Sequence, residues 1–344
     1  MKAPVSETLV PLHQCVGVDI SKLSFTACVC KKYMDDNIWL SDVCEFPNNK
    51  TGFNQLVKWS RKHLEKEVRC TYLMEPTGVY YEELAYHLHD KVKVQVIVIL
   101  PNKIKSYAEY LGIHTKTDEM DSRILAQIGA KESNLKLWEP PLPIFRELRS
   151  LCRFATDIKK LETQLNNHLE ALENSAYPEQ SVIKHYKSML KDLHKRMDEN
   201  EDAIKAKVAS DEDLNRRVEK VVTIPGVGFS TVVTILAETN GFELITNRKQ
   251  LAKYAGFDLV DRDSGTTVKG KKRISKKGNS RIRAALYFPA MVATRYNPEL
   301  REDYRRIIEK HPDHKMIGVT ALQRKLLLLI YTLWKSGEVY RKMD

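Results

Sequence analysis

Along the first hundred residues, apolar runs of strand length alternate with amphipathic stretches of helix length. The apolar runs cover 14–21, 24–33 and 37–46, and then 70–76 and 92–100. Helical patterns begin at Thr51, cover 80–90 and begin again at Pro101. Short apolar runs bounded by polar residues are typical of strands. The order of three strands, helix, strand, helix, strand and helix predicts an α/β sheet with an antiparallel start.

The pattern changes after residue 143, where apolar residues begin to recur at spacings of three, four or seven. They are Leu148, Leu151, Ile158, Leu161, Leu165, Leu169 and Leu172. Pro178 breaks this run, and a second, highly charged amphipathic stretch follows from about 182 to 208. Two long helices around a turn predict an antiparallel, coiled-coil hairpin. The sequence favours neither a purely intramolecular hairpin nor an oligomerisation arm.

A third region begins at 221, with a glycine turn, a basic stretch at 261–283 and helical patterns near 279–295 and 316–336. It predicts a mainly α C-terminal domain. We therefore expect three domains, at 1–143, 144–220 and 221–344.

Composition narrows the class of partner. The 344 residues are 42% hydrophobic and carry a formal net charge of +11. Such a basic excess is typical of proteins that bind nucleic acid or anionic membranes. No apolar run approaches the ~18–20 residues that span a bilayer, and the N-terminus lacks a signal-peptide layout. The six cysteines include no CxxC pair, so we expect reduced core thiols and a cytoplasmic protein without a membrane partner.

Four carboxylates lie at the ends of predicted strands or at the start of a predicted helix, where they could bind a metal ion together. Asp19 ends the first predicted strand and Glu75 the fourth, while Asp118 and Asp121 start a helix. Ligand sites gather at the carboxyl ends of strands, and residues spaced i,i+3 share a helix face. Any one of these acids could be a surface or capping residue. Together they predict a Mg²⁺ site, with Mn²⁺ as the alternative ion, suited to phosphoryl transfer.

Two features of the C-terminal region suit a phosphate backbone. Gly226 and Gly228 precede an apolar helix, in a turn that resembles half of a helix-hairpin-helix element. The alternative is a tight turn between packed helices. Further on, eight basic residues occur without an acid: Lys269, Lys271, Lys272, Arg273, Lys276, Lys277, Arg281 and Arg283. Folded surfaces usually mix signs, so this block predicts an anionic partner.

Glycines and serines lie within the basic block. Gly265, Gly270 and Gly278 would let backbone approach phosphates closely. Ser264 and Ser275 lie in the positive field, and a basic, metal-rich environment activates a serine hydroxyl that is otherwise a poor nucleophile.

Three segments carry a resemblance to a known family. VGVDIS, MEPTGVY and KTDEMDSRILA are similar to the three blocks of the DEDD transposases of insertion sequences, whose metal domain resembles the ribonuclease H-like (RuvC-like) domain of Holliday-junction resolvases. The third block includes Lys116 and Arg123, which we expect to contact nucleic acid. YAGFD and SKKGNSRIRAALYFPA are similar to the C-terminal transposase domain of the same family.

The resemblance implies a DNA transposase or site-specific recombinase acting on double-stranded DNA. It implies a serine nucleophile, which we assign to Ser264; Ser275 is the second choice and better suited to a turn or a helix cap. It further implies a dimer or tetramer with a composite site, and a structured noncoding guide RNA. A junction-resolvase-like nuclease, a DNA invertase and a non-catalytic nucleic-acid-binding protein remain as alternatives.

Overall fold

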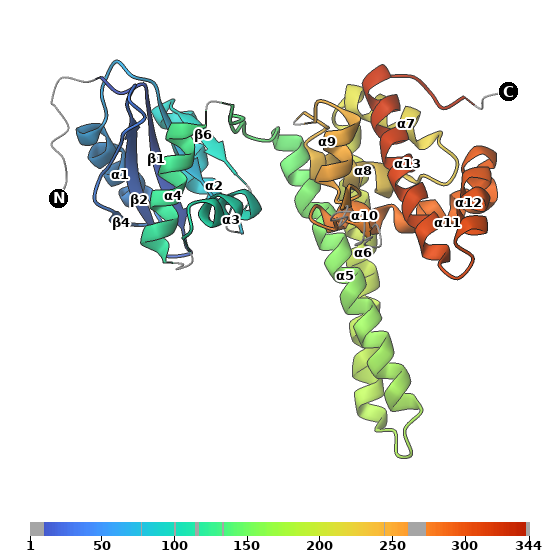
Figure 1. Ribbon diagram of the computed structural model, residues 1–344. Coiled ribbons are helices and arrows are strands. Elements are labelled where there is room, and N and C mark those ends of the chain that lie inside the picture. Colours follow the sequence, from blue (N-terminus) through green and yellow to red (C-terminus); the bar gives the residue numbers. More distant parts are fainter. Residues whose placement is uncertain are drawn as a thin grey trace. The chain divides into compact units, whose positions relative to one another are not determined.

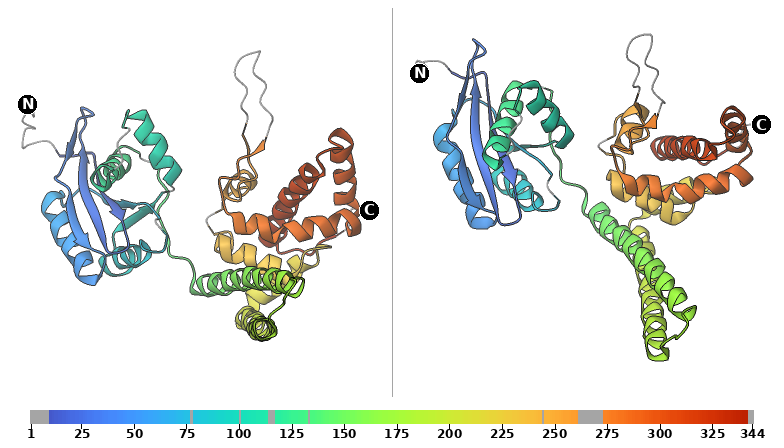
Figure 2. Two further views of the ribbon diagram at one scale, coloured as in Figure 1. Left: turned by 90° about the horizontal axis from the view of Figure 1, so that it is seen from below. Right: turned by 60° about the horizontal axis from the view of Figure 1, so that its bottom comes forward.

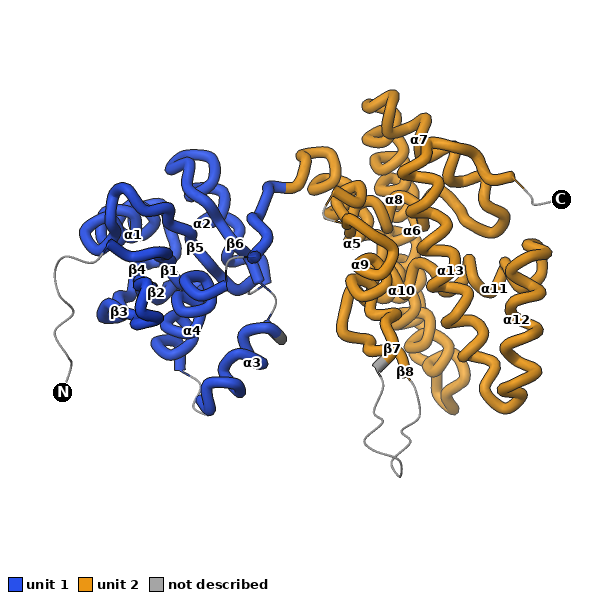
Figure 3. The backbone as a smooth tube through the Cα atoms, turned by 45° about the horizontal axis from the view of Figure 1, so that its top comes forward, with its two compact units in different colours: residues 1–140 blue, residues 141–344 orange. Residues whose placement is uncertain are grey.

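The chain divides into two units in the computed structural model: unit 1 is residues 1–140 and unit 2 is residues 141–344 (Figure 3). The structure describes residues 10–76, 78–99, 101–113, 117–132, 134–243, 245–260 and 273–341. Each unit is described below by itself.

Unit 1 is built on a mixed sheet. Its strands are β1 (His13–Ile20), β2 (Ser24–Lys32), β3 (Ile38–Leu40), β4 (Cys44–Pro47), β5 (Cys70–Met74) and β6 (Gln95–Val98). The order is β3-β2-β1-β5-β6, with β4 also paired to β2. β2 is antiparallel to β1, β3 and β4, whereas β5 is parallel to both β1 and β6. The predicted α/β sheet with an antiparallel start is confirmed.

The third predicted strand is two short strands, because the chain turns away between β3 and β4. Ser41 lies at the break. Its backbone N–H donates to the Val29 carbonyl, 2.9 Å away, and its hydroxyl accepts the Val29 N–H at 2.9 Å. The side chain therefore replaces a backbone acceptor in the ladder, which the apolar pattern of 37–46 did not indicate.

Helices cover both faces of this sheet (Figure 2). They are α1 (Lys50–His63), α2 (Glu82–Tyr86), the π-helix η1 (His87–Val92), α3 (Pro101–Tyr110) and α4 (Asp118–Lys131). Successive strand residues point to opposite faces. Val16 and Val18 of β1 accordingly pack with α1 residues such as Phe53, whereas Cys15 of β1 and Leu73 of β5 belong to the cluster on the α4 side.

All six cysteines lie within the described residues, and none forms a disulfide. Cys15, Cys28, Cys30 and Cys152 are buried; Cys44 and Cys70 are half-buried. Burial raises the pKa of the Cys15 and Cys30 thiols to about 12. The predicted core location is therefore confirmed for the four buried cysteines, and their reduced state stays a prediction.

Unit 2 begins with the predicted antiparallel hairpin, α5 (Pro143–Glu173) and α6 (Gln180–Ala209), which is confirmed. The base of the hairpin packs into the main core of the unit through Phe145, Leu148, Ile204 and Val208. Its far end has a separate cluster around Leu169, Ile183 and Leu190, and it projects beyond the other helices of the unit (Figure 1). The three-domain division stays a prediction.

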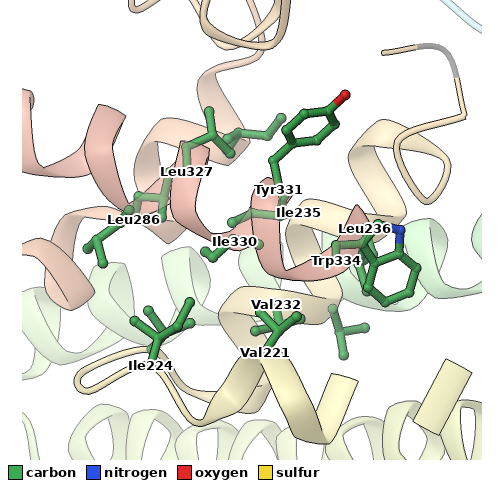
Figure 4. Close-up of a cluster of buried hydrophobic side chains, with 14 of the residues drawn as sticks. Val221, Ile224, Val232, Ile235, Leu236, Leu286, Leu327, Ile330, Tyr331 and Trp334 are labelled. Atoms are coloured by element: carbon green, nitrogen blue, oxygen red, sulfur yellow. The ribbon is translucent and has the colours of Figure 1, made fainter. Parts of the chain in front are cut away.

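The remainder of unit 2 is mainly helical. Its elements are α7 (Glu212–Val222), α8 (Phe229–Thr239), α9 (Arg248–Tyr254), β7 (Leu259–Val260), β8 (Arg273–Ile274), α10 (Ser280–Ala285), α11 (Tyr287–Tyr296), α12 (Pro298–Lys310) and α13 (Lys315–Ser336). Figure 4 shows how Val232 and Ile235 of α8 meet Ile330 and Trp334 of α13 in the core.

Helix α13 corrects one statement made from the sequence. It is long and apolar enough, by length and composition, to cross a membrane. Half of its most apolar window is buried inside unit 2, where Leu322, Leu326, Leu327 and Ile330 join the core. Arg324 and Lys325 interrupt its apolar residues, so the helix contains no uninterrupted apolar run of that length.

Candidate functional site

Asp19 and Glu75 lie at the same corner of the unit 1 sheet. In the parallel β1–β5 ladder, Val18 pairs with Met74, so Asp19 and Glu75 occupy the next position on each chain. Asp19 lies two residues after Gly17, which faces α4, and Glu75 lies two residues after Leu73. Because side chains alternate along a strand, both half-buried carboxylates belong to the α4 face.

Helix α4 brings two further acids to this corner. Thr117 caps the helix, its hydroxyl accepting the Met120 N–H at 3.2 Å. The Asp118 carbonyl accepts a 3.0 Å hydrogen bond from the hydroxyl of Thr26, the residue paired with Asp19 across β1 and β2. Asp118 is exposed and Asp121 is buried. The four predicted acids therefore gather around the ends of β1 and β5.

Gly17 explains how α4 comes so near the strand. A β-carbon at this position would lie 2.1 Å from the Ala126 nitrogen and 2.4 Å from the Ser122 carbonyl oxygen, both backbone atoms of α4. Only glycine permits this approach. The contact fixes the height of α4 over β1, and with it the place of Asp118 and Asp121.

The four acids suit a hard cation by donor type, since carboxylate oxygens are the ligands that Mg²⁺ prefers. Among the described residues, however, no three His, Cys, Asp or Glu side chains are grouped as ligands of one metal ion. The backbone brings the acids to one corner without arranging their side chains as a metal cage.

Two basic residues were also predicted near this corner. Lys116 lies outside the described residues. Arg123 is half-buried on α4, close to Cys28; burial raises the pKa of that thiol, and the Arg123 charge opposes the rise.

In unit 2, the described part of the basic block, 273–283, runs beside residues 254–258. The N–H groups of Ser275, Lys276 and Asn279 donate to the carbonyls of Asp258, Gly256 and Tyr254 at 2.7, 3.1 and 2.8 Å. This pairing continues the two-residue β7–β8 ladder. The block is therefore attached to the core through its backbone.

The structure gives Gly278 a different role from the predicted one. A β-carbon there would lie 2.5 Å from the Gly256 nitrogen. The glycine thus permits the approach of protein backbone, and not that of a phosphate. Gly265 and Gly270 lie outside the described residues.

The basic side chains of the block divide into two groups. Arg273, Lys276, Lys277 and Arg281 are exposed. Arg283 is half-buried, and its Nη1 donates to the Ala255 and Gly278 carbonyls at 2.7 and 3.3 Å. The Arg283 side chain therefore stabilises the protein backbone at this place. Lys269, Lys271 and Lys272 lie outside the described residues.

Of the two serines considered as nucleophiles, Ser264 lies outside the described residues. Ser275 donates to the Asp258 carboxylate and accepts the Lys277 N–H at 3.2 Å. Its hydroxyl stabilises a turn, as predicted for the second choice.

The two glycines of the turn before α8 have different roles. Gly226 has a φ of +89°, and a β-carbon there would lie 3.2 Å from Val292 of α11. This glycine is needed for the turn and for packing. Gly228 caps α8, is exposed and has no atom within 4 Å of a β-carbon position. Only the Gly228 end of the turn is open to a ligand.

Charge is divided unequally between the units. Residues 1–140 contain 18 Lys or Arg and 18 Asp or Glu, whereas residues 141–344 contain 38 and 27. The whole net charge of +11 therefore belongs to unit 2.

Comparison with known families covers both regions. Residues 218–305 match the model of the Transposase IS116/IS110/IS902 family, and residues 16–178 match a DEDD-type model described as a transposase. The "Pilin gene-inverting protein" of Moraxella bovis is 30% identical over 335 residues, covering 95% of this chain and 97% of the relative. The chain belongs to the IS110 family of transposases.

Two other relatives agree with this assignment. The "Pilin gene-inverting protein" of Moraxella lacunata has the same identity and coverage. An IS110 insertion-element protein of Streptomyces coelicolor is 23% identical over 120 residues, covering 35% of this chain and 29% of the relative. The transposase is therefore an enzyme that binds DNA and that cuts and transfers its strands.

One polar cluster of the transposase was missed from the sequence. Glu238, in the last turn of α8, is buried and bonded to Arg153 of α5 and Asn279, which caps α10. Its only sequence signal is an acid at the end of the apolar helix FSTVVTILAET. The partners lie 85 and 41 residues away, so no local pattern could have found them.

Proposed function

We propose that the transposase is a site-specific DNA recombinase with a ribonuclease H-like unit 1 and a serine nucleophile in unit 2. The observation that carries the proposal is that the backbone places Asp19, Glu75, Asp118 and Asp121 at one corner of the sheet, within a chain of the DEDD transposase family.

The four acids are the proposed ligands of Mg²⁺, which Mn²⁺ could replace. A bound pair of such ions activates a nucleophile and stabilises a leaving oxygen in phosphoryl transfer. The chain's own contribution is to position the four acids. The β1–β5 register sets Asp19 beside Glu75, and the Gly17 contact sets the start of α4 above them.

Ser264 is the proposed nucleophile. Its oxygen would form a bond to a DNA phosphorus as the bond from that phosphorus to one sugar oxygen breaks. The serine loses its proton, and the departing sugar oxygen ends as a hydroxyl. The assignment is supported by the turn-stabilising hydrogen bonds of Ser275, which already engage that hydroxyl.

The exposed basic residues of the block are proposed to bind phosphates. They are Arg273, Lys276, Lys277 and Arg281, with Lys269, Lys271 and Lys272 from the adjoining segment. The turn at Gly228 would act as a helix-hairpin-helix-like backbone contact. We extend this surface to a structured guide RNA and the active form to a dimer or tetramer, both on the family resemblance.

Inversion of a DNA segment is the specific reaction that we favour. Two relatives that span nearly the whole chain are named as pilin gene-inverting proteins. Inversion and transposition use the same strand chemistry and differ in the arrangement of sites.

A covalent-trapping assay tests the proposal. The protein would be incubated with DNA spanning the ends of its element, RNA transcribed from the flank and Mg²⁺, and then denatured. We expect a protein–DNA adduct in the wild type and in Ser275→Ala, and none in Ser264→Ala. Asp121→Ala should give neither adduct nor cleavage while retaining DNA affinity, because its proposed role is to bind metal.

Cleavage without an adduct in any variant would replace the serine with a water nucleophile and support a resolvase-like nuclease. An intact adduct in Asp121→Ala would remove that residue from the metal site.

A further inference from the structure

An ionic cluster joins three segments of unit 2 at the end of α8. The Glu238 side chain is 2% exposed. Its carboxylate accepts two hydrogen bonds from Arg153 of α5, at 2.8 Å from Nε and 3.0 Å from Nη2. Such a two-point contact fixes the plane of a guanidinium group as well as its position.

The basic block supplies the other side of the cluster. Asn279 donates to Glu238 Oε2 at 2.7 Å, and its Oδ1 accepts the Arg281 N–H at 2.9 Å. The Arg281 Nε lies 4.0 Å from Glu238 Oε1. Glu238 therefore binds an arginine of the hairpin directly and lies within 4.0 Å of an arginine of the block.

A third arginine belongs to the same cluster. Arg149 Nε donates to the Ala237 carbonyl at 3.0 Å, and the Tyr254 hydroxyl donates to the Glu238 carbonyl at 2.8 Å. These carbonyls belong to the C-terminal turn of α8, where the helix dipole favours cations. Arg149 and Arg153 lie four residues apart on α5, so they share one face of that helix.

Among the residues that the structure describes, the cluster contains one carboxylate, that of Glu238, and the guanidinium groups of Arg149, Arg153 and Arg281. Burial works to raise the pKa of Glu238, but the hydrogen bonds from Arg153 and Asn279, together with the charges of Arg153 and Arg149, lower the pKa, so the carboxyl stays ionised. The side chains of Arg153 and Arg281 are 39% and 42% exposed.

The side chains of Arg153 and Arg281 both reach solvent, and Arg281 follows the exposed Lys276 and Lys277 along the block. An arginine held at two points by a buried acid, as Arg153 is, is well suited to phosphate oxygens, because its geometry is set before the ligand arrives.

We propose that Arg149, Arg153 and Arg281 form a binding site for a phosphodiester group of a nucleic-acid strand, with Glu238 as the positioning residue. The base of the hairpin is then part of the nucleic-acid surface and not only a connection. The inference rests on the chain's binding of nucleic acid, and it requires neither the metal site nor Ser264.

The test uses the full-length double variant Arg153→Gln/Glu238→Gln. It removes one positive and one negative charge, so the net charge is unchanged, and the two amides can still hydrogen-bond. The matched control is Asp192→Asn/Arg196→Gln, which removes an exposed pair on α6, joined at 2.8 Å, in the same way. Affinity for a short DNA duplex and a structured RNA is measured without Mg²⁺ over a range of salt concentrations.

We expect the Arg153/Glu238 variant to bind about tenfold more weakly, with a log–log salt slope smaller by about one unit per lost phosphate contact. The control should match the wild type. A loss confined to the duplex identifies DNA as the source of the phosphate, and a loss confined to the RNA identifies RNA; either supports the site.

Wild-type affinity and slope in a folded double variant would overturn the site. If that variant does not fold, Arg149→Gln and Arg281→Gln carry the same test, because both leave the Arg153–Glu238 pair in place. Failure of the proposed recombinase mechanism looks different, since the trapping assay would then give no adduct while binding still depends on Arg153.

Discussion

Gly17 sets the distance between a strand and the helix that carries two of the four acids. Its α-carbon faces the backbone of α4, and a β-carbon would overlap the Ala126 nitrogen at 2.1 Å. Because the overlap is with backbone, no rotation of a neighbouring side chain relieves it.

Gly17→Ala is therefore expected to displace α4 from β1. Overpacking of this kind costs about 1–3 kcal/mol of unfolding free energy, and it should also abolish cleavage by moving Asp118 and Asp121 away from Asp19. Thermal unfolding and the cleavage assay measure the two effects. Gly112→Ala is the control, because a β-carbon there has no atom within 4 Å, although its φ of +70° costs some stability.

A Gly17→Ala protein with the thermal midpoint and cleavage rate of the wild type would show that the height of α4 does not control the acids.

Single residues also mark the limit of sequence reasoning. Asp19, Glu75, Asp118 and Asp121 could be singled out because each lies at the end of an element, and strand ends meet at one edge. Glu238 could not, because its importance comes from partners on α5 and α10. Gly278 was misjudged for the same reason, since its contact is with Gly256.

At the scale of elements, periodicity predicted the regular pieces and missed those shaped by their neighbours. The strands of unit 1 and the hairpin α5–α6 follow from apolar spacing. The break between β3 and β4 depends on the Ser41 side chain bonding to β2, which is a tertiary effect. Helices α9 and α12 were not predicted. Asn247 and Asn297 cap them, and the apolar pattern of each is short.

The hairpin α5–α6 presents apolar side chains outward as well as inward. Phe154 and Leu161 of α5 are 48% and 50% exposed, and Met189 of α6 is 52% exposed. Phe154 and Leu161 are seven residues apart, the repeat of a helix seam that meets a partner helix. Between the two interpretations that the sequence left open, we therefore propose that the hairpin is an oligomerisation arm.

Leu161→Gln/Met189→Gln should lower the oligomeric state seen by size-exclusion chromatography with light scattering, and leave the thermal midpoint nearly unchanged. The inward variant Leu190→Ala is the control. It removes a buried residue of the far cluster, and burial losses of this kind cost about 2–5 kcal/mol. An unchanged mass in the outward variant would leave the hairpin as an intramolecular element only.

At the scale of the whole molecule, the net positive charge and the four acids belong to different units. Unit 1 has no net charge and carries the four acids, whereas unit 2 carries the whole excess of +11. Each unit has hydrophobic clusters made of its own residues.

Residues 141–344 expressed separately are therefore expected to bind nucleic acid with nearly the salt slope of the full chain and to cleave nothing. Residues 1–140 should bind at least tenfold more weakly at ~0.1 M salt, because binding without base contacts depends on released counterions. Fluorescence anisotropy over a salt series measures both. A steep slope in the 1–140 fragment would place the phosphate contacts in unit 1 instead.

The uneven distribution of charge between the units also affects the order of events during binding. Long-range attraction acts before any contact forms, and it acts on the part of a molecule with excess charge. A nucleic acid diffusing toward this protein is drawn to residues 141–344, while residues 1–140 exert no net pull at a distance. We therefore expect unit 2 to bind the nucleic acid first, so that the four acids of unit 1 act on a strand that is already bound.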